Sequence, residues 1–449
     1  MNDIQIKEEI NKIEGEFQKA LVELVSIPSV LEEAKIGMPF GENIDIALRK
    51  VLSISEHLGF TTYLDPEGYY GYAQIGMGEE MIGILGHIDV VDAGNLQMWE
   101  TDPFVGVVKD GKMFGRGTSD DKGPTLAALF ATKALMNLGV IFNKRVRFIF
   151  GTDEENLWRC MDMYTKKEEL PTIGFTPDAT FPLVYAEKGL LQVILEGVNE
   201  TGLCFEVGAA LNAVPDQAIY DGLQQDELKI ALDARGFQYE SCENKVKVLG
   251  KSAHAMATQE GVNAVNRLLI ALKDIGQSSK IIDFVTDMVK ENPYGENIFG
   301  NLEDEMSGKL KFNVGKVKFT KMSESIMIDM RIPVTVEKDE IVKKLTEVAK
   351  KYQLTYKQYD YLKSIYIPKD SFLIKTLMKA YQEITGDTVS EPISSGGATY
   401  ARAMDNLVAF GATFLGQTAT EHQPNEHIEL EKMTKAMLIY AKAILSLVS

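Results

Sequence analysis

The chain is poor in cysteine and in positive charge. Its 449 residues include three cysteines, whose wide spacing forms neither a CxxC metal motif nor an even disulfide framework. The 47 basic residues are outnumbered by 65 acidic ones, and the formal charge of −18 would repel nucleic acid and anionic membrane surfaces. We therefore expect a protein of the reducing cytoplasm that has neither nucleic acid nor membrane as a partner.

Long apolar runs and several common catalytic motifs are also missing. No window of about twenty residues is apolar enough to span a bilayer, and the amphipathic N-terminal segment lacks the apolar core of a signal peptide. HExxH and GxSxG do not occur, and GKS at 250–252 lacks the upstream glycine of a phosphate-binding loop. The remaining catalytic residue types point to metal chemistry rather than to a serine nucleophile or a nucleotide.

Apolar patterning predicts an α/β fold in the first part of the chain. Residues 81–85, 145–151 and 172–176 are apolar runs typical of buried strands, and a helical segment with Pro124 in its first turn ends near Gly139. Strands that alternate with helices favour a doubly wound, mainly parallel sheet. Ligands of such sheets bind beyond the carboxyl ends of the strands.

A second domain interrupts this pattern. Past about residue 188, alternating apolar and polar residues at 188–198, 309–319 and 324–334 predict antiparallel strands, interspersed with helices. The last part of the chain returns to the character of the first. We therefore expect a discontinuous catalytic domain of residues 1–187 and 366–449, with an α+β domain of residues 188–365 inserted into it.

Acidic and histidine side chains follow the predicted strands. GHIDV at 86–90, GRGTSDDKGP at 115–124, TDEEN at 152–156 and TPDAT at 176–180 contribute His87, Asp89, Asp120, Asp121, Glu154, Glu155 and Asp178. Each has an ordinary structural explanation, such as a helix cap or a turn, but their recurrence at successive strand ends predicts a polynuclear metal site. The late segment EHQPNEH adds a further histidine, and spacing alone leaves the choice between His422 and His427 open.

These motifs together resemble the cocatalytic dizinc metallopeptidases that include carnosinase, aminoacylase and glutamate carboxypeptidase, in particular their bacterial dipeptidase branch. The resemblance covers nearly the whole chain. It implies that His87 and Asp178 hold one metal ion, that Glu155 and His422 hold the other, and that Asp120 bridges the two. It also implies a cis peptide between Asp120 and Asp121, with Glu154 as general base and Asp89 as the residue that orients His87. His427 has no role in the family.

The resemblance extends to the inserted segment, which it identifies as a lid. His254 in GKSAHA matches a histidine that donates to the developing oxyanion, and Arg331 in IDMRIP matches a partner of the substrate's C-terminal carboxylate. Asn212 in LNAVP matches a further substrate contact. Gly396 and Gly397 leave backbone space for a ligand. The size of the lid predicts a monomer.

A dipeptidase that hydrolyses unblocked dipeptides is therefore expected, with two divalent metal ions, zinc first and manganese or cobalt as alternatives. Two other functions fit the same residues. An N-acyl amino acid hydrolase of the same family would cleave acetylated or succinylated amino acids. A catalytically silent peptide-binding protein would bind dipeptides without turnover, although the presence of Glu154 beside a full ligand set argues against it.

Overall fold

The computed structural model describes residues 2–208, 210–242 and 244–449 and divides into two compact units. Unit 1 comprises Met1–Tyr185, Ile367–Ile393 and Thr399–Ser449, and unit 2 comprises Ala186–Tyr366 and Ser394–Ala398. The junctions expected at 187/188 and 365/366 differ from these by one or two residues. Residues 394–398, which the sequence placed in the first domain, group with unit 2 instead.

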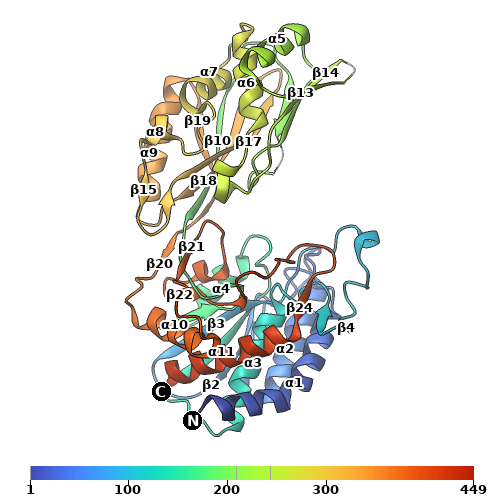
Figure 1. Cartoon of the computed structure of the whole chain (residues 1–449), viewed down its shortest axis with the longest axis vertical. Helices are drawn as coiled ribbons and strands as arrows, with labels where there is room; N and C mark the ends of the chain where they lie inside the picture. Colours follow the sequence, from blue (N-terminus) through green and yellow to red (C-terminus); the bar gives the residue numbers. More distant parts are fainter. Residues whose placement is uncertain (1, 209, 243) are drawn as a thin grey trace. The chain divides into compact units, whose positions relative to one another are not determined.

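Unit 1 contains a sheet that is parallel at its centre and antiparallel toward its edges (Figure 1). Its strands include β1 (Thr61–Leu64), β2 (Gly71–Ile75), β3 (Met81–His87), β6 (Arg145–Gly151), β7 (Ile173–Thr176), β22 (Leu407–Ala409) and β9 (Val184–Glu187), in the order β1-β2-β6-β3-β7-β22-β9. β6 and β7 both pair with β3 in parallel, and β22 pairs in parallel with β7. The α/β class expected from the sequence is confirmed.

The strand order makes the C-terminal end of β3 a topological switch point. After β3 the chain forms β6 on one side of it, and it then crosses to form β7 on the other side. Loops that leave a sheet on both sides of one strand open a crevice there, which is where α/β proteins bind ligands. His87 is the last residue of β3 and therefore lies at the edge of this crevice.

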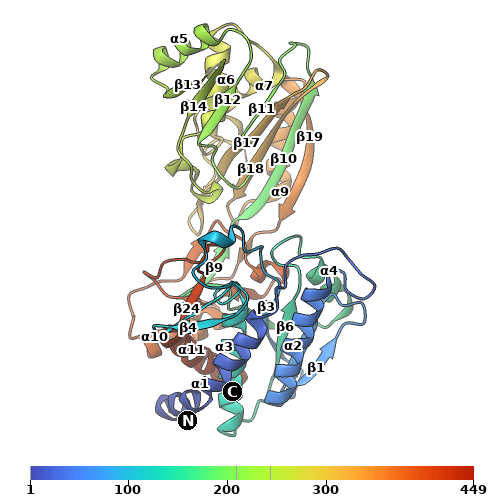
Figure 2. The ribbon, with the colours of Figure 1, turned by 90° about the vertical axis from the view of Figure 1, so that its right-hand side faces the viewer.

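Helices cover both faces of the sheet. They are α1 (Asp3–Val25), α2 (Glu42–Leu58), α3 (Lys122–Asn137), α4 (Arg159–Lys167), α10 (Phe372–Thr385) and α11 (Leu430–Val448). Arg147 and Phe148 are neighbours on β6 and point to opposite faces. Arg147 donates to the Tyr164 hydroxyl of α4 at 3.2 Å, whereas Phe148 packs its ring against Phe60, two residues beyond α2. Helices α1, α3 and α11 lie side by side (Figures 1 and 2).

The predicted apolar stripe of the first helix forms part of the core of unit 1. Its members are all buried, and they are Ile6, Ile10, Ile13, Phe17, Leu21 and Leu24. The loops of this unit contain further short strands, which are β4 (Val107–Lys109), β5 (Lys112–Phe114), β8 (Ala179–Thr180), β23 (Ala412–Thr413), β24 (His427–Glu429) and β21 (Ile393–Ser395). The last of these, β21, continues into unit 2. β24 pairs with β5 in an antiparallel arrangement.

Unit 2 is built on an antiparallel sheet, as its alternating sequence predicts (Figure 2). The strands β10 (Gly189–Val198), β11 (Phe205–Gly208), β17 (Lys311–Phe319), β18 (Ser323–Ile332) and β19 (Thr355–Leu362) take the order β11-β17-β18-β10-β19. A second sheet contains β12 (Gln217–Tyr220), β13 (Tyr239–Cys242) and β14 (Lys245–Leu249). The remaining strands are β15 (Glu303–Asp304), β16 (Gly308–Lys309) and β20 (Ile365–Tyr366).

One hydrophobic cluster fills unit 2 between its sheets and helices. The helices are α5 (Gln225–Arg235), α6 (Ala264–Asp274), α7 (Lys280–Phe284), α8 (Glu296–Phe299) and α9 (Lys338–Lys351). Alternate residues of β10, among them Leu191, Val193 and Leu195, are buried in this cluster. Leu268 and Leu269 of α6 join them there. Across residues 2–208, 210–242 and 244–449, no helix is both long enough and apolar enough to cross a bilayer.

Replacing Leu268 by Ala should destabilise the protein by about 2–5 kcal/mol, because the side chain is fully buried and its loss leaves a cavity. Urea unfolding followed by circular dichroism measures the change. Lys273→Ala on the same helix is the matched control and should cost no more than about 1 kcal/mol, since its ion pair with Asp283 lies at the surface. Equal effects of the two changes would contradict the assignment of the core.

Candidate metal centre

Segments that are distant in the sequence converge beyond the end of β3. His87 ends that strand, Asp120 lies in the loop before α3, Glu155 follows β6, and Asp178 follows β7. His422 comes from the loop between β23 and β24. Two groups of possible metal ligands form there, one of His87, Asp120 and Asp178 and the other of Asp120, Glu155 and His422, with the ligand atoms of each group within 4.8 Å of one another.

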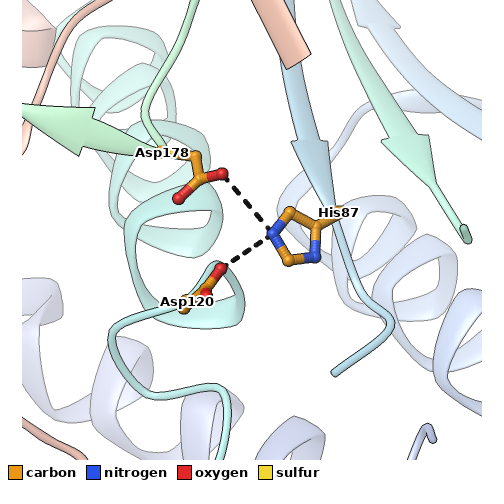
Figure 3. Close-up of side chains that lie close together, drawn as sticks. All are labelled: His87, Asp120 and Asp178. Carbon is orange, nitrogen blue, oxygen red and sulfur yellow. Dashed lines mark hydrogen bonds and ion pairs between the residues drawn. The ribbon is translucent and has the colours of Figure 1, made fainter. Parts of the chain in front are cut away.

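In the first group, one imidazole nitrogen faces two carboxylates (Figure 3). His87 Nε2 lies 2.9 Å from Asp120 Oδ1 and 3.6 Å from Asp178 Oδ2. The imidazole is completely buried, whereas the two carboxylates are 12% and 21% exposed. Three ligand atoms therefore point toward one small volume at the crevice.

The second group uses the other oxygen of the same aspartate. His422 Nε2 lies 2.9 Å from Asp120 Oδ2 and 3.1 Å from Glu155 Oε2. Asp120 thus presents Oδ1 to one imidazole and Oδ2 to the other. This is the arrangement expected of a carboxylate that bridges two neighbouring cations.

The structure distinguishes the two histidines of the EHQPNEH segment, which spacing could not. His422 lies at the site, whereas His427 sits on β24 with both ring nitrogens close to other protein atoms. Its Nδ1 is 2.9 Å from the Asn425 carbonyl oxygen, and its Nε2 is 3.0 Å from Lys112 Nζ. His427 belongs to neither ligand group within the described part of the chain.

Asp89 lies beside His87, but the atom that contacts the imidazole differs from our expectation. The family resemblance implied that Asp89 orients His87, and a carboxylate oxygen is a common acceptor for the second ring N–H of a metal-binding histidine. Instead, His87 Nδ1 lies 3.0 Å from the Asp89 carbonyl oxygen, and the nearest carboxylate oxygen is 3.6 Å away. The carboxylate accepts the backbone N–H groups of Glu154 and Glu155 at 3.2 and 3.1 Å, which draws it toward the loop after β6.

The adjacent residues Glu154 and Glu155 have different surroundings. Glu155 takes part in the second ligand group, whereas the Glu154 carboxylate belongs to neither group among the residues that the structure describes. Removal from water, together with the charges of Asp178, Glu155 and Asp120, raises the pKa of Glu154 well above its ordinary value. A carboxyl with a raised pKa can both accept and release a proton near neutral pH.

Mutual repulsion among the carboxylates perturbs their protonation. Burial and the charge of Asp120 raise the pKa of Asp178 to about 6. Burial alone would raise the pKa of Asp120, but hydrogen bonds with His422 and His87 outweigh it and lower the pKa. Hydrogen bonds with Asp120 and Glu155 raise the pKa of His422 to about 10. Protonated imidazoles therefore compensate the carboxylates, and cations that bind here would displace these protons.

The donor set fits divalent cations. Each group contributes one imidazole nitrogen and carboxylate oxygens from two further residues, and zinc, manganese and cobalt all accept such ligands. The excess of carboxylates in a largely buried place also favours bound positive charge. The residues present therefore match the metal that the sequence motifs imply.

The backbone before His87 packs closely against the start of α3. A Cβ atom on Gly86 would lie 1.8 Å from Thr125 Oγ1 and 2.8 Å from Asp121 Oδ2, so only glycine fits before His87. The Asp121 carboxylate accepts the Thr125 hydroxyl at 2.7 Å and the His87 backbone N–H at 3.2 Å. The peptide bond between Asp120 and Asp121 is cis, as the family resemblance implied.

Two residues at the site were missed by the sequence analysis. Tyr400, in the SGGATYAR segment, is fully buried and packs edge-on against the His87 ring with centroids 5.9 Å apart. Its hydroxyl lies 2.9 Å from Cys160 Sγ. Glu426, in the EHQPNEH segment, is also fully buried and contacts the loop that carries Asp120. Both lie inside motifs already recognised, but nothing local distinguished them from loop residues.

The residues that we expect to contact the substrate all lie in unit 2 and are distant in sequence from the two groups of metal ligands. His254 Nδ1 accepts the Met256 backbone N–H at 3.1 Å, and the backbone N–H of Ala255 donates to the Asn212 carbonyl at 2.8 Å. Burial and the charge of Arg331 lower the pKa of His254. The Asn212 side chain is exposed.

Arg331 is only 3% exposed and is already engaged within the protein. Its Nε and Nη2 donate to the two carboxylate oxygens of Asp329 at 2.7 and 3.2 Å, and its Nη1 donates to the Gly396 carbonyl at 3.0 Å. The Gly397 backbone N–H donates to Ser395 Oγ at 2.9 Å. Gly396 is tightly placed, because a Cβ there would lie 2.5 Å from Met256 Cβ.

Comparisons with known proteins find relatives that match almost the whole chain. A protein of Bacillus subtilis named "Putative dipeptidase YtjP" is 35% identical over 95% of this chain and 96% of its own, and a similarly named Staphylococcus haemolyticus protein, SH1171, is 34% identical over 98% and 99%. Among solved structures, human carnosine dipeptidase 1 matches with a TM-score of 0.61 at 15% identity over 100% of both chains. The yeast dipeptidase Dug1p from Saccharomyces cerevisiae also matches with 0.61, at 14% identity over 99% and 98%.

The family match and the curated relatives define a hydrolase of the metallopeptidase class, and the paired ligand groups suit such an enzyme. The chain belongs to peptidase family M20/M25/M40, whose sequence model matches residues 83–446. The solved structures support the two-domain fold, and the curated relatives support the assignment along almost the whole chain.

Exchanging His422 for Ala should weaken metal retention, because the second group then keeps only carboxylate ligands. His427→Ala should retain the metal content of the unaltered protein, since its ring contacts Lys112 and the Asn425 carbonyl instead. Elemental analysis after dialysis against a weak chelator measures both. Equal metal loss in the two variants would contradict the assignment.

Proposed function

We propose that this metallopeptidase is a dipeptidase that hydrolyses unblocked dipeptides with the help of two divalent cations. The observation that carries the proposal is the position of Asp120, whose two carboxylate oxygens each face a different imidazole at 2.9 Å. His87 and Asp178 would hold one cation, Glu155 and His422 the other, and Asp120 would bridge them. Divalent cations in such a site supply Lewis-acid activation of water and of the scissile carbonyl.

Glu154 is the proposed general base. Its carboxylate stands outside both ligand groups, and its raised pKa suits it to take a proton from the attacking water. The same carboxyl then passes that proton to the leaving amine. Asp89 supports this arrangement by fixing the backbone of Glu154 and Glu155 through two hydrogen bonds and by presenting its carbonyl to His87.

His254 is the proposed donor to the oxyanion that forms on the scissile carbonyl. Its lowered pKa favours the neutral imidazole at pH 7. Because Nδ1 accepts the backbone N–H of Met256, the single ring proton resides on Nε2, which is then able to donate. Asn212 is the proposed further contact to substrate, since the paired backbone segments bring it close to His254.

Arg331 is the proposed partner of the substrate's C-terminal carboxylate. The bidentate contact with Asp329 holds the guanidinium plane and leaves one N–H on each of Nη1 and Nη2 beyond the hydrogen bonds described above. A fixed fork of two donors matches a carboxylate. Gly396 and Gly397 would provide backbone space beside it. Recognition of this carboxylate together with the free N-terminus of the substrate would exclude longer peptides.

Zinc is the proposed metal, with manganese and cobalt as alternatives that the ligand set also accepts. The test is a panel of free dipeptides and their N-acetylated counterparts, assayed with each of the three metals. We expect hydrolysis of the free dipeptides and little of the acetylated ones. Preference for acetylated substrates would favour an N-acyl amino acid hydrolase, and peptide binding without any turnover would favour a silent binding protein.

Glu154→Gln should retain metal while lowering kcat by at least about a hundredfold, because a positioned general base contributes 10²–10⁴-fold. Glu155→Gln, one residue away with the same loss of charge, should instead weaken metal retention, since Glu155 contacts His422 at 3.1 Å. Metal content and kcat are measured on both variants. Equal loss of metal and of activity in Glu154→Gln would mean that the two roles have been exchanged.

Arg331→Lys should raise KM about 10- to 100-fold for dipeptides with a free C-terminal carboxylate, because a charged hydrogen bond contributes about 1.5–3 kcal/mol. Dipeptide amides should respond much less, since they lack the charge that the guanidinium recognises. Initial-rate kinetics on matched acid and amide substrates measure the difference. An identical rise in KM for both substrates would indicate a structural role for Arg331.

We also propose that the chain acts as a cytoplasmic monomer. The cysteine content supports the location, and the length of the inserted segment supports the monomer. Light scattering at the concentrations used for kinetics should give the mass of one chain. A stable dimer whose activity falls on dilution would contradict the proposal.

A further inference from the structure

Glu426 makes a concentrated set of contacts with the loop that carries Asp120. Its Oε1 accepts the backbone N–H groups of Gly117, Ser119 and Asp120 at 3.0, 2.8 and 3.2 Å. Its Oε2 accepts Arg116 Nη1 at 2.7 Å, and its own carbonyl accepts the Gly115 N–H at 2.9 Å. One side chain therefore fixes most of the loop between β5 and α3.

The Glu426 carboxylate is completely buried, and both of its oxygens accept hydrogen bonds from the surrounding protein. A buried carboxylate without partners would be costly, but three backbone N–H groups and a guanidinium compensate this one. Arg116 is itself held in place, because it donates to the Asp92 carbonyl at 3.3 Å and stacks on Trp99 at 5.4 Å from the ring centroid. The contact is thus rigid on both sides.

These contacts join the two segments that supply ligands from opposite ends of the chain. Glu426 lies four residues after His422 and directly before β24, whose His427 pairs with Phe114 of β5. The antiparallel pairing fixes the register of the two segments, and the Glu426 carboxylate then fixes the backbone N–H of Asp120 itself. The distance between Asp120 Oδ2 and His422 Nε2 depends on this junction.

Glu426 is not itself a ligand in this arrangement. It belongs to neither of the two ligand groups found among the described residues, and both of its carboxylate oxygens point to donors of the loop. Its effect on the metal centre must therefore pass through Asp120 and His422. The nearby Glu421 differs, because the contacts of its carboxylate among the described residues are with the hydroxyls of Ser119 and Thr413, at 3.2 and 3.3 Å.

We propose that Glu426 is a positioning residue of the metal centre, which sets the bridging Asp120 against His422 by holding the backbone of the loop that carries Asp120. This inference rests on the proposed function, because it requires that Asp120 and His422 hold cations. Outer partners of metal ligands commonly alter metal affinity 10- to 100-fold when they are lost. Because Asp120 is common to both groups, binding of both cations should weaken.

The test is metal binding by the metal-free full chain, with Glu426→Gln compared with Glu421→Gln. In the glutamine variant one carboxylate oxygen is replaced by an NH₂ group, which would face either the three backbone N–H donors or the Arg116 guanidinium and could accept from neither. We expect dissociation constants for Zn²⁺ that rise about 10- to 100-fold in Glu426→Gln, together with an altered visible spectrum of the Co²⁺-loaded protein. Glu421→Gln removes the same charge from the same segment and should leave both readouts unchanged.

If Glu426 had a purely structural role, Glu426→Gln would unfold at a lower temperature but would keep the Zn²⁺ affinity and the Co²⁺ spectrum of the unaltered protein. That combination of results would overturn the proposal. Should that variant fail to fold, Arg116→Lys keeps the three backbone contacts and should show a smaller loss of affinity in the same direction. Unchanged affinity in a folded Arg116→Lys then counts against the proposal. If the unaltered protein binds no Zn²⁺ at all, the proposed function fails first.

Discussion

The structure depends on the gathering of several carboxylates around two imidazoles at the end of β3. Besides burial, the charges of Asp120 and Glu155 raise the pKa values of Glu154 and Asp178. Like charges in a partly buried place repel, and only positive charge between them makes the arrangement favourable. Protonated imidazoles provide such charge here, and the proposed cations would provide it when bound, which allows the loops that carry these residues to lie together.

A second set of carboxylates, outside the ligand groups, ties the loops to one another. The Asp89 carboxylate, after β3, accepts two backbone N–H groups of the loop after β6. The Asp121 carboxylate accepts the backbone N–H of His87, and the Glu426 carboxylate accepts three N–H groups of the loop before α3. The segments that bear His87, Asp120 and Glu155 are thus each fixed by an acidic residue of another segment, because a carboxylate accepts several N–H groups at once.

The central sheet could be anticipated because burial is encoded locally. The runs at 81–85 and 145–151 became β3 and β6, and the stripe of Ile6, Ile10 and Ile13 became the buried face of α1. The antiparallel strands of unit 2 followed from the alternation in β10, β17 and β18. Side chains on a strand or helix repeat with a fixed period, so the pattern alone shows which face is buried. The exact limits of the two units, and the placement of 394–398 in unit 2, did not follow from it.

Which chemical groups stand at the ends of the strands follows from the amino-acid sequence alone, since acids and histidines directly after apolar runs can be recognised there. The tertiary structure decided between His422 and His427, showed that Asp89 meets His87 through its carbonyl, and brought Glu426 onto the loop of Asp120. The reason is physical. Contacts between loops some three hundred residues apart depend on strand order and register, and these are set by the packing of the whole domain rather than by neighbouring residues.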